Sequence, residues 1–401
     1  MKIRSSCLCV AAFGVIACSV APVRAAGVAL VTPVSSGSSS LAESAAAQPF
    51  VNPLPAPDTS KLRALPASGR YEPGVRIPGF VSSTGTRAFG TFGIPYTSGR
   101  VQTFPVLNVA GNAPNYLSTT YPYSAIGKLT FTVPGGSAFC SASLIRRSVM
   151  VTAAHCVQNF GQATQFSNWK FQPGHYGAAG ATTAQKAPFG TWTTKLVARS
   201  DSWANGTDPG TGSARENDLA VFIIAKRAGK FLGDTVGWLA YGWNNYSFVS
   251  SPKTGNLLVG AISTLGYPGL MDSGRIMQRA DGPTYTTTIS GAPQLWQGNN
   301  FTGGSSGGPW IVNFRAVDPV LSGGAVQGSS PNMAVVGVTS WGSADPNAPK
   351  DNYSSQFGQN SLYPDADYGG YGAGNIGALV NELCGSDAGS GQTYAQQGYC
   401  D

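Results

Sequence analysis

Two adjacent serines, Ser305 and Ser306, lie in the glycine-rich stretch FTGGSSGGPW at residues 301–310. A serine becomes a nucleophile at neutral pH when a nearby base takes its proton and a third group orients that base. The chain contains only two histidines, His155 and His175, that could serve as the base. The order of these residues along the chain therefore restricts the chemistry that they can perform.

Chain order excludes two known arrangements of a catalytic serine. Residues 304–308 fit the G-x-S-x-G turn of α/β-hydrolases, but those enzymes need a histidine after the serine, and none follows Ser306. The subtilisin order needs an aspartate before the histidine, and only Asp58, in a proline-rich stretch, precedes His155. The order that remains is histidine, aspartate, serine.

The surroundings of two residues favour them as base and acid. His155 follows the apolar run SVMVTAA, and Asp218 precedes the apolar run LAVFII, so a strand end can hold each side chain in place. Asp208 and Asp234 are weaker candidates for the acid because both lie among glycines typical of turns. We therefore expect His155, Asp218 and a serine of the 301–310 stretch to act together.

Short strands must position these residues. From residue 124 onward, runs rich in β-branched and aromatic residues alternate with Gly, Pro, Asn and Asp: AIGKLTFTV, SASLI, SVMVTAA, LAVFII, LLVGAISTLGY, TYTTTI and AVVGVTSW. Only residues 375–384, NIGALVNELC, have apolar side chains at helical spacing. The pattern predicts antiparallel sandwiches or barrels followed by one short C-terminal helix.

The motifs VTAAHC, NDLAVF, GGSSGGP and TSWGS occur in the order found in trypsin-like serine proteases of the chymotrypsin fold, which the chain resembles over about residues 120–385. YSAIGKLTF, GYPG at 266–269 and FTGGSSGGPW are more similar to the bacterial branch that includes the glutamyl endopeptidases. The resemblance implies an all-β fold of two six-stranded antiparallel β-barrels with the active site between them.

The resemblance also implies roles for single residues. His155 corresponds to the general base, Asp218 to the residue that orients it, and Ser306, which directly precedes Gly-Gly-Pro, to the nucleophile. The N–H groups of Gly304 and Ser306 correspond to the oxyanion hole, where losing one donor costs on the order of 3 kcal/mol in the transition state. The implied enzyme is an endopeptidase that works through an acyl-enzyme intermediate and needs no cofactor.

The sequence departs from trypsin at the residues implied for specificity and activation. Ser305 stands where trypsin has the aspartate that pairs with its new N-terminus, so the same electrostatic activation cannot operate. Asn300 and Thr339 stand where a charged group would select basic or acidic substrates, while Ser340, Trp341 and Gly342 correspond to the strand that lines the specificity pocket. We therefore expect a preference for uncharged residues before the scissile bond.

Four of the seven cysteines lie beyond the leader, an even number that fits disulfides in an oxidising compartment: Cys140, Cys156, Cys384 and Cys400. Their order alone allows three pairings. The resemblance implies a Cys140–Cys156 bridge beside the catalytic histidine, which leaves Cys384 to Cys400. With two histidines and these cysteines in the chain, few nitrogen and sulfur ligands remain for a metal, and we expect no metal site. The alternative is calcium held by backbone and carboxylate oxygens.

The N-terminal quarter of the chain has a different composition. Residues 1–25 combine Lys2 and Arg4 with an apolar run and a small-residue cleavage site, as signal peptides do. An alternative is lipidation at Cys18, after Val-Ile-Ala, which would anchor the protein at the cell surface. Residues 26–118 are a low-complexity pro-segment or tether that we expect to be largely disordered, with Arg100-Val101 a conceivable processing point, and 119–401 form the protease domain.

The remaining composition limits the partners. The formal net charge is +7, of which residues 119–401 contribute only +1, so nothing indicates nucleic acid or an anionic membrane. We expect a monomer, secreted or periplasmic, that acts on proteins or peptides without inserting into a membrane. The alternative from another class is a catalytically silent protease-fold binding protein.

Overall fold

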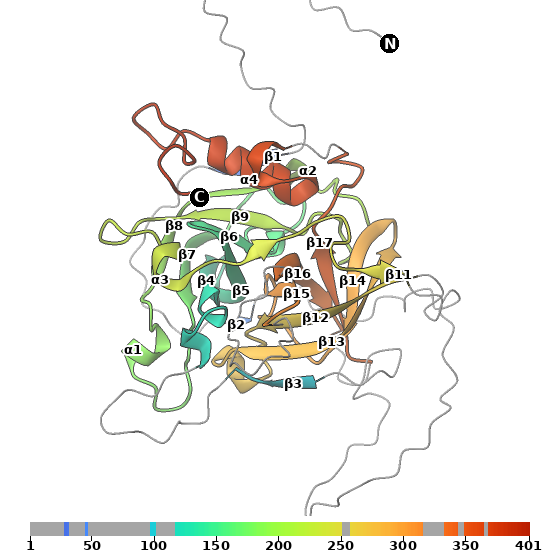
Figure 1. The fold of residues 1–401 in the computed structure, drawn as a ribbon, viewed down its shortest axis with the longest axis horizontal. Helices are drawn as coiled ribbons and strands as arrows, with labels where there is room; N and C mark the ends of the chain where they lie inside the picture. The colour runs from blue at the N-terminus through green and yellow to red at the C-terminus, as the bar shows by residue number, and fades with distance from the viewer. Residues whose placement is uncertain are drawn as a thin grey trace, which may run out of the picture.

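The computed structural model describes residues 28–31, 45–46, 97–101, 117–250, 257–315, 333–343, 349–364 and 368–401. The proposed signal peptide, Cys18 and most of the 26–118 segment lie outside these residues. The described chain forms two closed six-stranded antiparallel β-barrels side by side (Figure 1), which confirms the predicted fold class.

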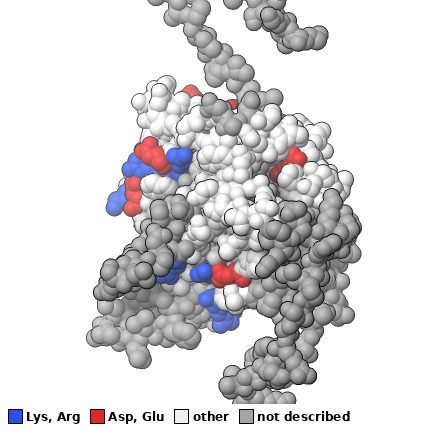
Figure 2. Space-filling model, turned by 45° about the vertical axis from the view of Figure 1, so that its right-hand side comes forward, with Lys and Arg blue, Asp and Glu red and all other residues white. Residues whose placement is uncertain are grey.

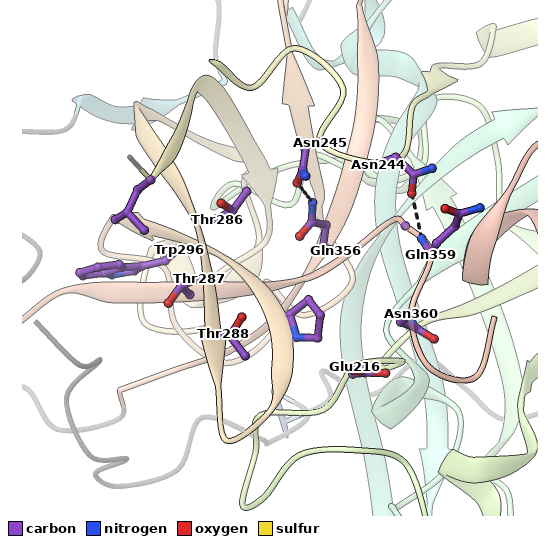
Figure 3. Close-up of a pocket in the computed structure, with 13 residues that line it drawn as sticks. Glu216, Asn244, Asn245, Thr286, Thr287, Thr288, Trp296, Gln356, Gln359 and Asn360 are labelled. Atoms are coloured by element: carbon purple, nitrogen blue, oxygen red, sulfur yellow. Dashed lines mark hydrogen bonds between the residues drawn. The ribbon is translucent and has the colours of Figure 1, made fainter. Parts of the chain in front are cut away.

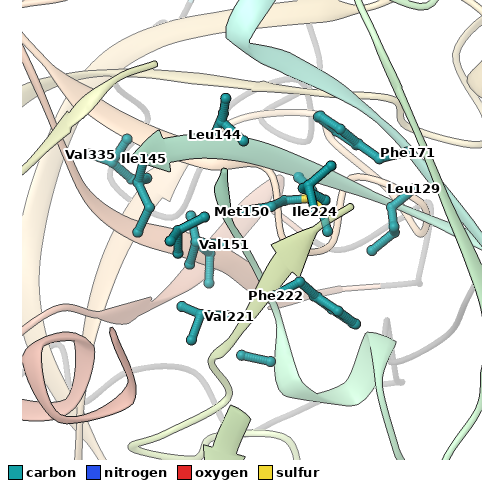
Figure 4. Close-up of a cluster of buried hydrophobic side chains, with 14 of the residues drawn as sticks. Leu129, Leu144, Ile145, Met150, Val151, Phe171, Val221, Phe222, Ile224 and Val335 are labelled. Carbon is teal, nitrogen blue, oxygen red and sulfur yellow. The ribbon is translucent and has the colours of Figure 1, made fainter. Parts of the chain in front are cut away.

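The first barrel closes in the order β4-β5-β6-β9-β8-β7. Its strands are β4 (Ile126–Val133), β5 (Gly136–Arg146), β6 (Val149–Thr152), β7 (Ser167–Pro173), β8 (Trp192–Ser200) and β9 (Ala220–Ile224). All residues of β6 and β9 are buried, and their apolar side chains fill the barrel together with Leu129, Leu144 and Phe171 (Figure 4). His155 follows β6 and Asp218 precedes β9, so both residues are positioned by fully buried strands.

The second barrel closes in the order β12-β13-β14-β17-β16-β15. Its strands are β12 (Leu258–Gly266), β13 (Gln278–Ile289), β14 (Ala292–Gly298), β15 (Pro309–Val312), β16 (Ala334–Gly342) and β17 (Asp351–Gln356). Ser306 lies in the turn before β15, and Ser340 lies near the end of β16. Two smaller strands extend this sheet: β10 (Ala240–Tyr241) beside β16 and β11 (Val249–Ser250) beside β12.

Three short pieces of the 26–118 segment pair with the barrels. These are β1 (Val28–Val31), antiparallel to β8; β2 (Ala45–Ala46), parallel to β5; and β3 (Thr97–Arg100), antiparallel to β13. Arg100, the last residue of β3, forms an ion pair with Asp272, and Val101 is buried and donates its N–H to the Met277 carbonyl. The Arg100-Val101 bond therefore lies against the second barrel.

The predicted C-terminal helix is confirmed as α4 (Gly374–Gly385), which buries Ile376, Leu379, Val380 and Leu383 against the first barrel (Figure 1). The other described helices are single turns: α1 (Thr183–Lys186), α2 (Asp201–Asn205), α3 (Gly233–Val236), and the 3₁₀ turns η3 (Leu117–Thr119), η4 (Tyr123–Ala125), η5 (Ala154–Cys156), η7 (Asp272–Gly274) and η8 (Gly369–Tyr371). Among the described residues, no helix has the length and apolarity that crossing a membrane requires.

Charged side chains are sparse on the described surface. They make up 11% of the chain, and the face in Figure 2 is mostly uncharged, with small groups of both signs. Several are paired with each other, as Arg147 is with Asp234 and Asp401. The described residues on this face form no large patch of one sign (Figure 2).

Candidate active site

Two neighbouring strands bring His155 and Asp218 together. His155 lies in η5, directly after β6, and Asp218 lies just before β9. Because Thr152 of β6 pairs with Ala220 of β9, the end of one strand lies beside the start of the other. His155 Nδ1 is 2.7 Å from Asp218 Oδ2, and the His155 backbone N–H donates to Oδ1 at 2.9 Å.

The Asp218 carboxylate is buried, and both of its oxygens take part in hydrogen bonds. Its exposed fraction is 2%, and the Ser340 hydroxyl from the second barrel also donates to Oδ2, at 2.6 Å. A carboxylate only accepts hydrogen bonds, so the ring proton of a neutral His155 belongs on Nδ1. Nε2 is then left with a free lone pair, as a general base requires.

Ser306 lies in a tightly anchored turn. The Ser141 N–H donates to the Ser306 carbonyl at 2.8 Å, and the Gly307 N–H donates to the Thr339 carbonyl at 2.7 Å. Ser306 Oγ and His155 Nε2 are both buried and have no hydrogen-bond partner in the described part of the chain. These are the two atoms between which a proton would move when the serine attacks.

The backbone around Gly304 suits an oxyanion hole. Gly304 has φ +95°, and a Cβ at this position would lie 2.4 Å from the Phe139 ring, so only glycine fits. Within the described residues, the N–H groups of Gly304 and Ser306 donate to no protein acceptor. Both donors are therefore available to a substrate oxygen.

Three of the residues expected at the specificity pocket have different surroundings. Trp341 is buried, donates from Nε1 to Gln294 Oε1 at 3.1 Å, and stacks on Tyr353 with 3.8 Å between ring centroids. The Thr339 hydroxyl accepts from Trp310 Nε1 at 2.9 Å, which directs it into the second barrel. Asn300 differs because its Oδ1 is buried and accepts from no donor among the described residues.

Sequence reasoning did not identify Asn352, which holds the segment around Asn300. From β17, its Nδ2 donates to the carbonyls of Asn299 and Phe301, at 3.0 and 3.3 Å. Its Oδ1 is, like that of Asn300, buried without a donor. No local sequence signal marks Asn352, because its role arises from the pairing of β17 with β14 and β16.

The structure contains both disulfides, Cys140–Cys156 and Cys384–Cys400. His155 lies close to the first, and its ring nitrogen and the two sulfurs lie within 4.8 Å of one another. Sulfurs joined in a disulfide are not thiolates and do not serve as metal ligands. This cluster is therefore a covalent support for the histidine loop.

The two disulfides allow a matched test, because both bridge a sequence separation of 16 residues. Replacing either pair by alanines should lower the free energy of unfolding by about 3 kcal/mol, measured in urea. Only the Cys140→Ala/Cys156→Ala variant should also lose kcat per folded molecule, since that bridge ties the turn that carries His155 to strand β5. Equal kcat in the two double variants would contradict a role for the first bridge in the site.

The second histidine, His175, is packed away from the candidate triad. Its ring is buried, its Nδ1 has no hydrogen-bond partner within the described segments, and it contacts the Tyr267 ring edge-on. Burial, aided by the positive charge of Lys128, lowers the pKa of His175 to about 3. His175 is thus a neutral structural residue near pH 7.

This depressed pKa makes stability depend on pH. Because the unfolded chain protonates His175 near pH 6.5 and the folded chain only near 3, stability should fall as the pH drops between these values. In His175→Gln, the unfolding free energy measured in urea should depend less steeply on pH than in wild type, by about 1.4 kcal/mol per pH unit between pH 6 and 4. Plots of unfolding free energy against pH should run parallel for wild type and variant between pH 7 and 8. Parallel plots below pH 6 would contradict the buried, neutral state of His175.

A pocket of about 710 Å³ lies along the second barrel (Figure 3). Threonines of the β13–β14 hairpin face Asn244, Asn245 and Gln356 across it, with Trp296 at one side and Glu216 at another. The lining includes none of His155, Asp218 and Ser306. This hollow is therefore separate from the candidate active site.

The sequence model of the trypsin family matches residues 117–355. This match covers more than half of the chain and includes every residue of the candidate site. The chain belongs to the trypsin family of serine endopeptidases. None of the curated proteins compared with the chain matches it.

Solved structures of bacterial and related proteases are similar to the chain. Protease Anisep from Arthrobacter nicotinovorans is 24% identical, with a TM-score of 0.44 over 60% of this chain and 92% of that one. The thermostable serine protease AL20 from an extremophilic microorganism is 23% identical, with a TM-score of 0.44 over 59% and 92%. A Glu endopeptidase in complex with MPD is 18% identical, with a TM-score of 0.40 over 60% and 88%.

Proposed function

We propose that the protein is a secreted serine endopeptidase that cleaves peptide bonds through His155, Asp218 and Ser306. The observation that carries the proposal is the buried 2.7 Å contact between His155 Nδ1 and Asp218 Oδ2, combined with Ser306 Oγ and His155 Nε2, which have no hydrogen-bond partner within the described chain. Family membership alone does not distinguish an active member from a silent one. A complete set of base, orienting carboxylate and free hydroxyl favours the active one.

The reaction follows from these atoms. Ser306 Oγ attacks the peptide carbonyl carbon while His155 Nε2 takes the hydroxyl proton. The carbonyl oxygen becomes negative and accepts hydrogen bonds from the N–H groups of Gly304 and Ser306. The imidazolium, stabilised by Asp218, then protonates the leaving amine, which leaves an acyl-enzyme on Ser306. Water, deprotonated by Nε2, releases the acid and restores the serine.

The proposed setting is outside the cytoplasm. Two disulfides persist where the environment is oxidising, and the leader at residues 1–25 has the composition of a signal peptide. The intact mass of the mature protein distinguishes secretion from anchoring. A start near Ala26 or later excludes a lipid on Cys18, whereas a lipidated N-terminal Cys18 supports a surface protease.

Active-site labelling tests the catalytic proposal. The purified mature protein, with its N-terminus sequenced, is treated with a fluorophosphonate and digested for mass spectrometry. We expect one phosphonylated peptide, modified at Ser306, and loss of peptidase activity in proportion to labelling. No labelling, in protein that is folded and has intact disulfides, would support the silent binding protein instead.

Cleavage is expected after uncharged residues. Asn300 is neutral, so a charged side chain before the scissile bond would find no counter-charge there, and burying an unpaired charge is costly. Asn300, which the resemblance assigns to the specificity pocket, has a buried Oδ1 that accepts from no donor in the described part of the chain, and this favours a substrate side chain that donates a hydrogen bond. Glutamine should therefore exceed methionine, which is similar in length, by about tenfold in kcat/KM.

A mixed peptide library analysed by mass spectrometry measures this preference. The paired Gln and Met substrates differ only at the residue before the scissile bond, so they isolate the hydrogen-bond effect. Dominant cleavage after Arg, Lys or Glu would show that the pocket carries a charge that we have not recognised.

A further inference from the structure

Something other than an ion pair must order the turn that carries Gly304. Ser305 occupies the position at which the trypsin resemblance implies an aspartate, and its hydroxyl is used locally, donating to the Thr302 carbonyl at 2.7 Å. Glycine at φ +95° has wide conformational freedom, so an unsupported Gly304 would spend part of its time with its N–H turned away from the substrate. The ordering contacts must therefore come from neighbouring segments.

The loop after β12 aims the Gly304 N–H. Gly269 of this loop donates its N–H to the Gly303 carbonyl at 2.6 Å. The Gly303–Gly304 peptide bond is trans, so its carbonyl and its N–H point in opposite directions. Fixing the Gly303 carbonyl toward Gly269 therefore turns the Gly304 N–H away from the loop. This N–H donates to no protein acceptor in the described chain.

Ser141, on β5 of the first barrel, ties this loop to the nucleophile turn. Its hydroxyl donates to the Gly304 carbonyl at 2.9 Å and accepts from the Tyr267 N–H at 2.9 Å. Its backbone N–H donates to the Ser306 carbonyl at 2.8 Å. One buried residue thus contacts both oxyanion-hole residues and the start of the GYPG loop.

Ser141 is itself held rigidly. Its carbonyl accepts from the Thr152 hydroxyl at 2.9 Å, and the neighbouring Cys140 is bridged to Cys156. Thr152 and Cys156 flank His155 along the chain. The same framework therefore fixes the base and the oxyanion turn relative to each other.

We propose that Ser141 is a positioning residue which, together with the Gly269 N–H, holds the oxyanion hole in its working shape. These contacts order the turn, which the uncharged Ser305 cannot do through an ion pair. This inference rests on the proposed function. Preorganised donors stabilise a transition state because they need not be reoriented during the reaction. Loosening the turn should therefore affect the transition state more than the binding of substrate.

The test compares Ser141→Ala with Ser143→Ala. Ser143 is two residues further along β5 and equally buried, but its hydroxyl has no hydrogen-bond partner in the part of the chain that the structure describes. In Ser141→Ala we expect kcat to fall by about 10- to 50-fold, less than the loss of a whole oxyanion donor, with KM within twofold of wild type. A peptide boronic acid, which mimics the tetrahedral intermediate, should lose the same factor in affinity, and Ser143→Ala should match wild type in both.

Each measurement is referred to active sites counted by fluorophosphonate labelling, so misfolded protein does not lower the apparent kcat. If Ser141→Ala does not fold, Thr302→Val gives a second test, because the Thr302 hydroxyl accepts from the Leu270 N–H at 3.1 Å and joins the same loop to the turn. Its kcat should fall severalfold at constant KM.

Three results would overturn the proposal: kcat within twofold of wild type in the folded variant, a rise in KM with boronate affinity unchanged, or an equal loss in Ser143→Ala. Failure of the proposed function is separate, since it would appear as wild-type protein that is not labelled at Ser306.

Discussion

Ser306→Ala is expected to lower kcat/KM by a factor of about 10⁴ to 10⁶ on a chromogenic peptide, because no other group can form the acyl-enzyme. The same change should leave the thermal midpoint within about 1 °C of wild type, since Ser306 Oγ has no hydrogen-bond partner to lose among the residues that the structure describes. The activity that remains would come from binding and from the oxyanion hole alone. Steady-state kinetics and calorimetry on the same preparations measure both quantities.

Ser305→Ala is the matched control for this prediction. Ser305 is the adjacent serine, equally buried, and its hydroxyl makes one local bond to the Thr302 carbonyl. We expect its kcat/KM to fall by less than about tenfold, the cost of one neutral hydrogen bond. If Ser305→Ala abolished activity and Ser306→Ala did not, the two serines would have been assigned the wrong way round.

The candidate triad could be predicted because chemistry restricts both the types of its residues and their order. With two histidines in the chain, the absence of a histidine after Ser306 was enough to exclude one arrangement. The structure adds the reason why residues 63 positions apart can meet, since His155 and Asp218 sit at facing ends of the neighbouring strands β6 and β9. The local sequence predicts the two strands, but the contact between His155 and Asp218 depends on how the strands pair.

Ser141 and Asn352 could not be predicted for the same reason. Ser141 contacts Gly304 across 163 residues, and Asn352 contacts Asn299 across 53. Nothing in the residues beside them distinguishes these side chains from other polar residues on strands. Their positions depend on the register between strands and on how two barrels meet, which no local periodicity specifies.

The strands of the barrels were predictable from apolar runs, whereas those of the 26–118 segment were not. Composition there predicts too little apolar surface for independent folding. Yet all four residues of β3 are exposed, and the strand is held by its pairing with β13. Backbone hydrogen bonds to an existing sheet edge need no apolar side chains, so composition does not detect such strands.

Asp218→Asn should lower kcat by about 10⁴ near neutral pH while leaving the fold intact. The carboxylate now accepts from His155 Nδ1, from the His155 backbone N–H and from Ser340. An amide has one oxygen for these three donors, and its NH₂ group directed at Nδ1 would move the ring proton to Nε2, where it blocks proton transfer from Ser306. Stopped-flow acylation with an activated ester should show that the acylation step has slowed.

Asp208→Asn separates this effect from the general cost of changing a buried acid. Asp208 is similarly buried and accepts three hydrogen bonds, from the Asn217 backbone, the Asn217 side chain and Ser202. Because these bonds are structural, the variant should lose about 1–3 kcal/mol of unfolding free energy but keep kcat per labelled site within severalfold of wild type. A similar loss of kcat in both variants would mean that Asp218 acts by supporting the fold, and not by holding the tautomer of His155.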